Sequence, residues 1–135
     1  MWDGRNENGS LVPDGRYVAR VRVTRPGGSY AHEVTVRHMP FMAWTPSWIR
    51  DRGDTVTLKV TTVEPLRRKP VVTANQPGIR KVTVPAKRVT RLGPNQYKVV
   101  IRTKDQGLAG DMKVRVTGID SAGGTNTKVF TVLLR

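Results

Sequence analysis

Residues 54–60 read DTVTLKV, a stretch in which polar and apolar residues alternate without a break. In an extended chain Val56, Leu58 and Val60 fall on one face, and the residues between them fall on the other. The same period of two returns in residues 96–102 (QYKVVIR), 111–116 (DMKVRV) and 129–134 (VFTVLL). Turn-forming runs rich in Gly, Pro, Asp and Asn separate these segments. The sequence therefore predicts an all-β chain folded as an antiparallel β-sandwich.

Two more alternating segments, residues 16–24 and 31–37, come before a boundary that we expect near residues 38–40. Two antiparallel strands are marginal in water when one face stays uncovered. We therefore expect 1–38 to be a partial β module and 39–135 to be a complete sandwich. The partial module would be covered by the sandwich, by chain upstream or by another copy. The residues predicted to share its half-buried faces are Tyr17, Ala19, Val21 and Val23, and His32, Val34 and Val36.

Residues 2–9 read WDGRNENG, which contains the turn dipeptides Asp3-Gly4 and Asn8-Gly9. Read as a calcium loop, the stretch places Gly4 and Gly15 where carboxylate ligands are required, so we interpret it as a structural corner. Trp2 is expected to seal the base of the sandwich. The residues of this predicted turn motif are Trp2, Asp3, Gly4, Gly9, Pro13, Gly15 and Tyr17.

Residues 2–24 resemble the end of the Ig-like domain of flagellar hook-capping proteins and related bacterial surface modules. The shared pattern is W-D-G-x-[ND]-x-x-G-x-x-[VL]-P-x-G-x-Y followed by an alternating strand. Residues 41–135 are similar in pattern to bacterial Ig-like or fibronectin-type modules, through GDTVTLKV (53–60), EPL (64–66) and VRVTGIDSAGG (114–124). These resemblances imply an Ig-like β-sandwich with an extracellular or cell-surface location and a non-enzymatic, repetitive architecture.

The net charge of +14 is unevenly distributed along the chain. Residues 65–104 contain eleven basic side chains and no acidic one. This segment predicts attraction to a polyanion or to an acidic partner. Its only aromatic residue, Tyr97, is expected to point inward, so specific nucleic-acid recognition is not expected. The residues predicted to contact a polyanion or partner are Arg67, Arg68, Lys69, Arg80, Lys81, Lys87, Arg88 and Arg91.

Trp44 and Trp48 lie four residues apart around Pro46, and two interpretations are open. In the first, both side chains face one side of the chain and are exposed. Exposed aromatic side chains at such a place could stack on sugar rings or on a partner. The second interpretation, which we prefer, is a seam between the two modules, with Met39, Phe41 and Met42 nearby.

No catalytic, cofactor or metal site is expected. The chain has no cysteine, which excludes disulfides, thiolate catalysis and cysteine-based zinc sites. Its two histidines, His32 and His38, lack carboxylates at metal-ligand spacing and are expected to be partly buried. Asp120 has two interpretations, a cation ligand or an acceptor for backbone N–H groups of its own turn. The second interpretation is preferred.

Three functions are compatible with the sequence. The first is a structural or spacer module of a bacterial surface or filament protein, which associates with other copies or neighbouring Ig-like modules by strand complementation. The second is an adhesion module for anionic polysaccharide or another polyanion. The third is an accessory domain of a larger secreted enzyme. The first residues show no signal peptide, and no segment is apolar enough for membrane insertion.

Overall fold

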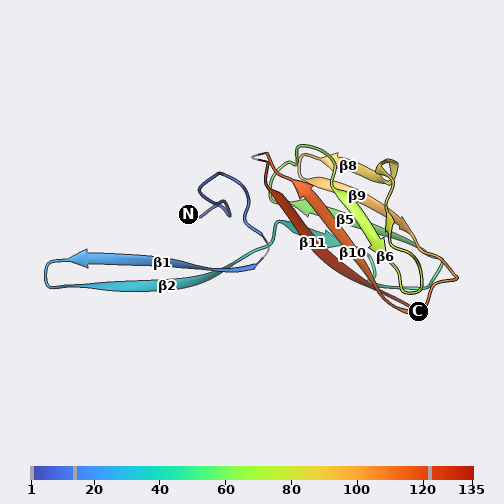
Figure 1. Ribbon diagram of the computed structural model, residues 1–135, viewed down its shortest axis with the longest axis horizontal. Helices are drawn as coiled ribbons and strands as arrows, with labels where there is room; N and C mark the ends of the chain where they lie inside the picture. The colour runs from blue at the N-terminus through green and yellow to red at the C-terminus, as the bar shows by residue number, and fades with distance from the viewer. Residues whose placement is uncertain (1, 14, 122) are drawn as a thin grey trace.

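The computed structural model describes residues 2–13, 15–121 and 123–135. They form a two-sheet sandwich and a two-stranded hairpin that extends away from it (Figure 1). In these ranges the only helical element is a 3-10 turn, η1 (Ala86–Arg88). The strands are β1 (Gly15–Arg25), β2 (Gly28–His38), β3 (Phe41–Trp44), β4 (Ile49–Arg50), β5 (Thr55–Thr62), β6 (Val71–Asn75), β7 (Val82–Thr83), β8 (Val89–Gly93), β9 (Gln96–Arg102), β10 (Gly110–Ile119) and β11 (Thr125–Leu134).

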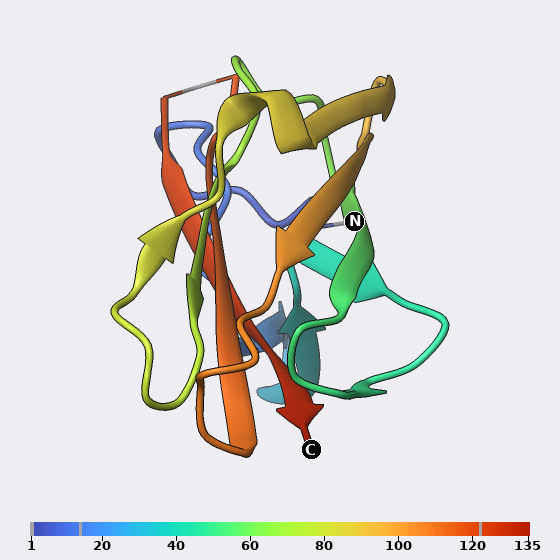
Figure 2. The same cartoon turned by 90° about the vertical axis from the view of Figure 1, so that its right-hand side faces the viewer.

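The strand order of the sandwich is that of an immunoglobulin domain. One sheet has the order β3-β5-β9-β8 and the other has the order β4-β11-β10-β6-β7. Lettered along the chain with β4 and β7 as A′ and C′, these orders are A-B-E-D and A′-G-F-C-C′, which contain the ABED and GFC sheets of that fold. The two sheets face each other in Figure 2. All pairings are antiparallel except that of β4 with β11, which is parallel. The predicted all-β sandwich is confirmed.

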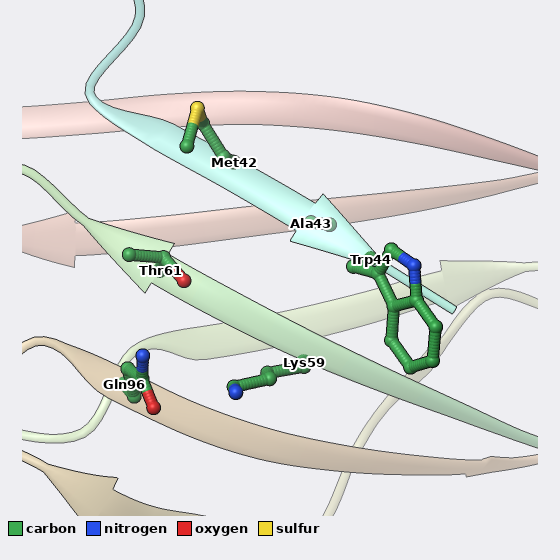
Figure 3. A pocket seen from close by; sticks show the side chains of 6 residues that line it. All are labelled: Met42, Ala43, Trp44, Lys59, Thr61 and Gln96. Atoms are coloured by element: carbon green, nitrogen blue, oxygen red, sulfur yellow. The ribbon is translucent and has the colours of Figure 1, made fainter. Parts of the chain in front are cut away.

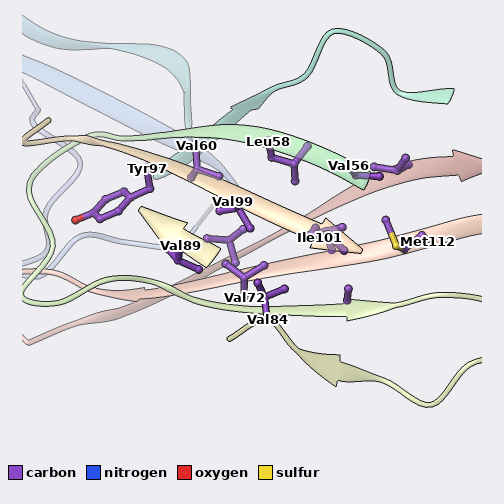
Figure 4. Packing of buried hydrophobic residues seen from close by; sticks show 14 of the residues in the cluster. Val56, Leu58, Val60, Val72, Val84, Val89, Tyr97, Val99, Ile101 and Met112 are labelled. Atoms are coloured by element: carbon purple, nitrogen blue, oxygen red, sulfur yellow. The ribbon is translucent and has the colours of Figure 1, made fainter. Parts of the chain in front are cut away.

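The core consists of the side chains that alternation directs between the two sheets (Figure 4). Leu58 of β5, Val99 of β9 and Val114 of β10 are completely buried, and their neighbours two residues away in each strand are also buried. These are the inward faces that the period of two predicts. Because the chain has no cysteine, the two sheets are held together by packing and loop contacts without a disulfide.

The hairpin of β1 and β2 is regular but uncovered. Its strands pair in register from Gly15 opposite His38 to Arg25 opposite Gly28, which leaves Pro26-Gly27 as the turn. Gly27 has a φ of 91°, as the second central residue of a type II turn requires. The expectation that both strands are half-buried is wrong for most of their length, because residues 18–35 are exposed on both faces. Only the base of the hairpin is covered, where Trp2 of the N-terminal segment packs against Tyr17 and His38.

Candidate functional site

The N-terminal corner, residues 2–13, is held together by its own turns. Gly4 and Gly9 have φ values of 82° and 77°, in the region that favours glycine. A carboxylate oxygen of Asp3 accepts a hydrogen bond from the Arg5 backbone N–H at 3.0 Å. At the end of the motif, the Tyr17 hydroxyl donates to the Pro13 carbonyl at 2.7 Å. The structural corner predicted from the turn dipeptides is thus present.

Trp2 packs at the base of the hairpin. Its ring lies 5.2 Å from the ring of Tyr17 and 5.9 Å from that of His38, measured between centroids. The prediction that Trp2 seals the sandwich is therefore wrong. Its aromatic contacts are with Tyr17 of β1 and His38 of β2. A Cβ on Gly4 would lie 2.6 Å from His38 Cε1, so residue 4 must be glycine for His38 to be buried in this position.

The corner is fastened to the sandwich mainly through Asp120. This carboxylate is buried and accepts backbone N–H bonds from Gly124 and from Leu11, each at 2.8 Å. The bond from Gly124 confirms the preferred interpretation of Asp120 as an acceptor in its own turn. The bond from Leu11 joins residues 109 positions apart, and an ion pair between Arg5 and Glu64 adds a second attachment. The base of the hairpin is thereby fixed to one end of the sandwich.

One face of the hairpin is apolar and exposed. Cross-strand partners on this face are Ala19 with Val34, Val21 with His32, and Val23 with Tyr30. The opposite face is more polar and includes an ion pair between Arg20 and Glu33. In the described residues β1 pairs only with β2, so the outer edge of each strand also carries free backbone hydrogen-bonding groups. An exposed apolar face and two long free edges are the features of a sheet that another chain can extend.

The residues predicted for polyanion contact do not form one patch. The Arg67 guanidinium donates to the Ser121 carbonyl, and that of Arg91 donates to the carbonyl of Gly93. The Lys69 ammonium donates to the carbonyl of Ala86, the first residue of η1. Lys81 lines a groove on the outer face of the five-stranded sheet with Lys113 and Arg115. Arg68 and Lys87 are exposed in other parts of the surface.

The structure gathers four cations at one open side of the sandwich, between β7 and β9, and two of them, Arg80 and Arg88, belong to the predicted set. We call this the cationic cleft, a hollow of about 310 Å³ that continues into a smaller one. Among the described residues, no acidic side chain lines it. Arg102 and Lys104 were missed as candidates although they belong to the same acid-free run of sequence. The side chains that give the cleft its charge are Arg80, Arg88, Arg102 and Lys104.

Trp44 lies in the four-stranded sheet, whereas Trp48 packs beside the five-stranded sheet. Trp44 ends β3 in the four-stranded sheet, whereas Trp48 precedes β4 and stacks on Phe130 of β11 at 6.5 Å between ring centroids. The interpretation in which both face one side is wrong because the chain crosses between the sheets after Trp44. Phe41, expected at a seam, is 2% exposed in the sandwich core. Trp44 is 62% exposed and is the free aromatic surface of the pair.

Trp44 borders a groove of about 550 Å³ on the outer face of the four-stranded sheet (Figure 3). β3, β5 and β9 each contribute outward-facing side chains to it, and we call it the Trp44 groove. Sequence reasoning identified Trp44 but not its neighbours, whose proximity depends on the register of three strands. The lining residues are Met42, Ala43, Trp44, Lys59, Thr61 and Gln96.

The two histidines lie at different positions along β2. His38 is buried at its base, as predicted, whereas His32 is exposed on the apolar face and the prediction of partial burial is wrong for it. Within 2–13, 15–121 and 123–135, no three His or acidic side chains lie close enough together to hold a metal ion.

A scan of protein-family models and a search of curated protein sequences found no match to the chain. In the described part of the chain, no helix has the length and apolar character needed to cross a membrane.

Proposed function

We propose that this protein is a non-enzymatic structural module of a bacterial surface or filament protein, and that it assembles through its hairpin with another copy of itself. The observation that supports the proposal is the exposure of both hairpin strands with an intact apolar face. Val21, Val34 and Tyr30 are 60%, 47% and 56% exposed. Burial of a side chain such as valine contributes about 1.5 to 3 kcal/mol, so covering this face would supply a substantial driving force.

The geometry favours strand addition over contact between globular surfaces. A strand of a neighbouring copy can extend the free edge of β1 or β2 through backbone hydrogen bonds. The apolar face of the neighbour's hairpin can then cover the apolar face of this one. Residues 15–38 contain five arginines and one glutamate, so two hairpins repel each other at low salt. Salt screens this repulsion and leaves the apolar contact intact. We therefore expect assembly to strengthen as the salt concentration rises.

The test is the solution mass, measured by light scattering after gel filtration at low and high salt. The wild-type chain should form species larger than a monomer. Val21→Lys places a charge on the apolar face and should give a monomer. Val18→Lys is the matched control, because Val18 is 61% exposed on the same strand but on the opposite face. A monomeric wild type, or equal disruption by the two variants, would contradict assembly through this face.

The cationic cleft supports a second candidate function, adhesion to an anionic polymer. Four cations around Val82 and Ile101 offer a positive site, and no acidic side chain of the described residues lines it. Binding should fall steeply with salt, because each phosphate or sulfate that is neutralised releases counterions. Arg88→Gln combined with Arg102→Gln should weaken binding of heparin and reduce its salt dependence. Arg20→Gln on the hairpin is the control, and an equal effect of the control would mean that net charge alone drives adhesion.

A further inference from the structure

The outer face of the four-stranded sheet contains an arrangement that the fold does not need. Lys59 of β5 lies directly opposite Lys98 of β9 in the strand register. Both side chains are exposed, and neither forms an ion pair among the described residues. Like charges directly opposite each other destabilise a sheet. A ligand with a negative group placed between them would remove that cost.

The next residue in the same row is Trp44, which lies directly opposite Lys59 on the other side. Among the described residues, its indole has neither an aromatic partner nor a hydrogen bond. Indole offers a broad apolar face and one N–H donor. The row therefore presents a flat aromatic surface followed by two positive charges.

The remaining groups around this row are neutral and polar. Thr61 and Gln96 line the Trp44 groove, and Thr90 lies opposite Lys98 on the far side. Hydroxyl and amide groups both donate and accept hydrogen bonds, as the hydroxyls of a sugar require. At about 550 Å³, the groove falls within the size range of small-molecule sites.

From this arrangement we infer that the Trp44 groove binds an acidic saccharide. A sugar ring packs on the Trp44 indole, and its hydroxyls bond to Thr61 and Gln96. Its carboxylate lies at the border of the groove, between Lys59 of the lining and Lys98, which lies beside the groove opposite Lys59. Single-stranded nucleic acid fits less well, because its binding sites stack successive bases on several aromatic side chains and this face offers only Trp44 among the described residues. The inference is independent of hairpin assembly and of the cationic cleft, which uses other residues.

The test is calorimetric titration of the whole chain with trigalacturonate, a short chain of uronic acids. Trp44→Ala should weaken binding by at least about tenfold, whereas Trp44→Phe retains an aromatic face and should keep most of the affinity. Lys59→Gln should cost about tenfold to a hundredfold, the range expected for a hydrogen bond to a charged group. The matched control is Lys81→Gln, an exposed lysine at the edge of the other sheet, which should leave the affinity unchanged. Circular dichroism checks that each variant is folded.

Competing ligands distinguish saccharide recognition from simple charge attraction. The methyl ester of trigalacturonate has the same rings without the charge and should bind at least about tenfold more weakly. Tripolyphosphate and oligothymidylate supply charge without a sugar acid and should not displace trigalacturonate from the groove. Absence of binding at millimolar trigalacturonate, equal binding by Trp44→Ala, or displacement by either of these anions would overturn the inference. The double variant of the cationic cleft, Arg88→Gln with Arg102→Gln, gives a further check. If it lost trigalacturonate binding while the Trp44 and Lys59 variants kept it, the ligand would lie in the cationic cleft and the inference would be overturned.

Discussion

Asp120→Ala should lower the free energy of unfolding by about 2 to 4 kcal/mol, because two backbone N–H groups lose their acceptor. The donors are those of Leu11 and Gly124, and the carboxylate between them is 1% exposed. The effect should be visible as a lower urea midpoint with little change in the slope of the transition. The N-terminal corner should also become more accessible to protease, since Leu11 loses one of its attachments to the sandwich.

Asp111→Ala is the matched control for this prediction. Asp111 is an exposed carboxylate on β10, and its ion pair with Lys113 spans 3.4 Å between partly exposed groups. Exposed pairs of this kind contribute about 0 to 1 kcal/mol, so its loss should barely move the midpoint. Asp120→Asn keeps one acceptor oxygen and should fall between the two. Equal midpoints for Asp120→Ala and Asp111→Ala would show that Asp120 does not hold the corner in place.

Leu58→Ala should cost about 2 to 5 kcal/mol, the range for removing a large aliphatic side chain from a packed core. Leu58 is completely buried at the centre of β5. Val21→Ala, in an equally regular strand, should change the stability of the monomer by less than about 0.5 kcal/mol, because Val21 is 60% exposed. Both values come from urea denaturation at a protein concentration low enough to keep the chain monomeric.

The result for Val21→Ala shows whether the apolar face of the hairpin stabilises the monomer or only the assembly. A small effect in the monomer together with a large effect on assembly means that the apolar face contributes only when another chain covers it. A destabilisation of the monomer comparable to that of Leu58→Ala would contradict the exposed position of the hairpin.

The comparison of β5 with β1 also shows what could be predicted from the sequence. Alternation identified both as strands and assigned Leu58 and Val21 to apolar faces, and both assignments agree with the structure. It could not say which apolar face is covered, since the period of two depends on the local chain and the cover comes from distant segments. The same reason explains Asp120: its bond to Gly124 follows from the turn, whereas its bond to Leu11 depends on the folded chain.

The candidate surfaces could also be predicted only in part, because their residues come together from distant segments of the chain. The acid-free run of residues 65–104 indicated positive potential, but which cations meet depends on how β7 and β9 are placed in opposite sheets. Arg80 and Arg102 therefore share a cleft, while Arg67 and Arg91 bond to nearby backbone carbonyls. Trp44 was identifiable as a candidate aromatic, and only the pairing of β3, β5 and β9 reveals the lysine pair beside it.

The length of the hairpin sets the spacing of any array that it builds. Eleven residues per strand span roughly 35 Å, so a hairpin that engages its neighbour acts as an arm that separates successive sandwiches. The outer faces of both sheets would then stay open to solvent in every copy. Weak sites on those faces would be displayed repeatedly along the array, and a long polymeric ligand could occupy several at once. Binding by the array would consequently exceed that of a single module through effective concentration alone.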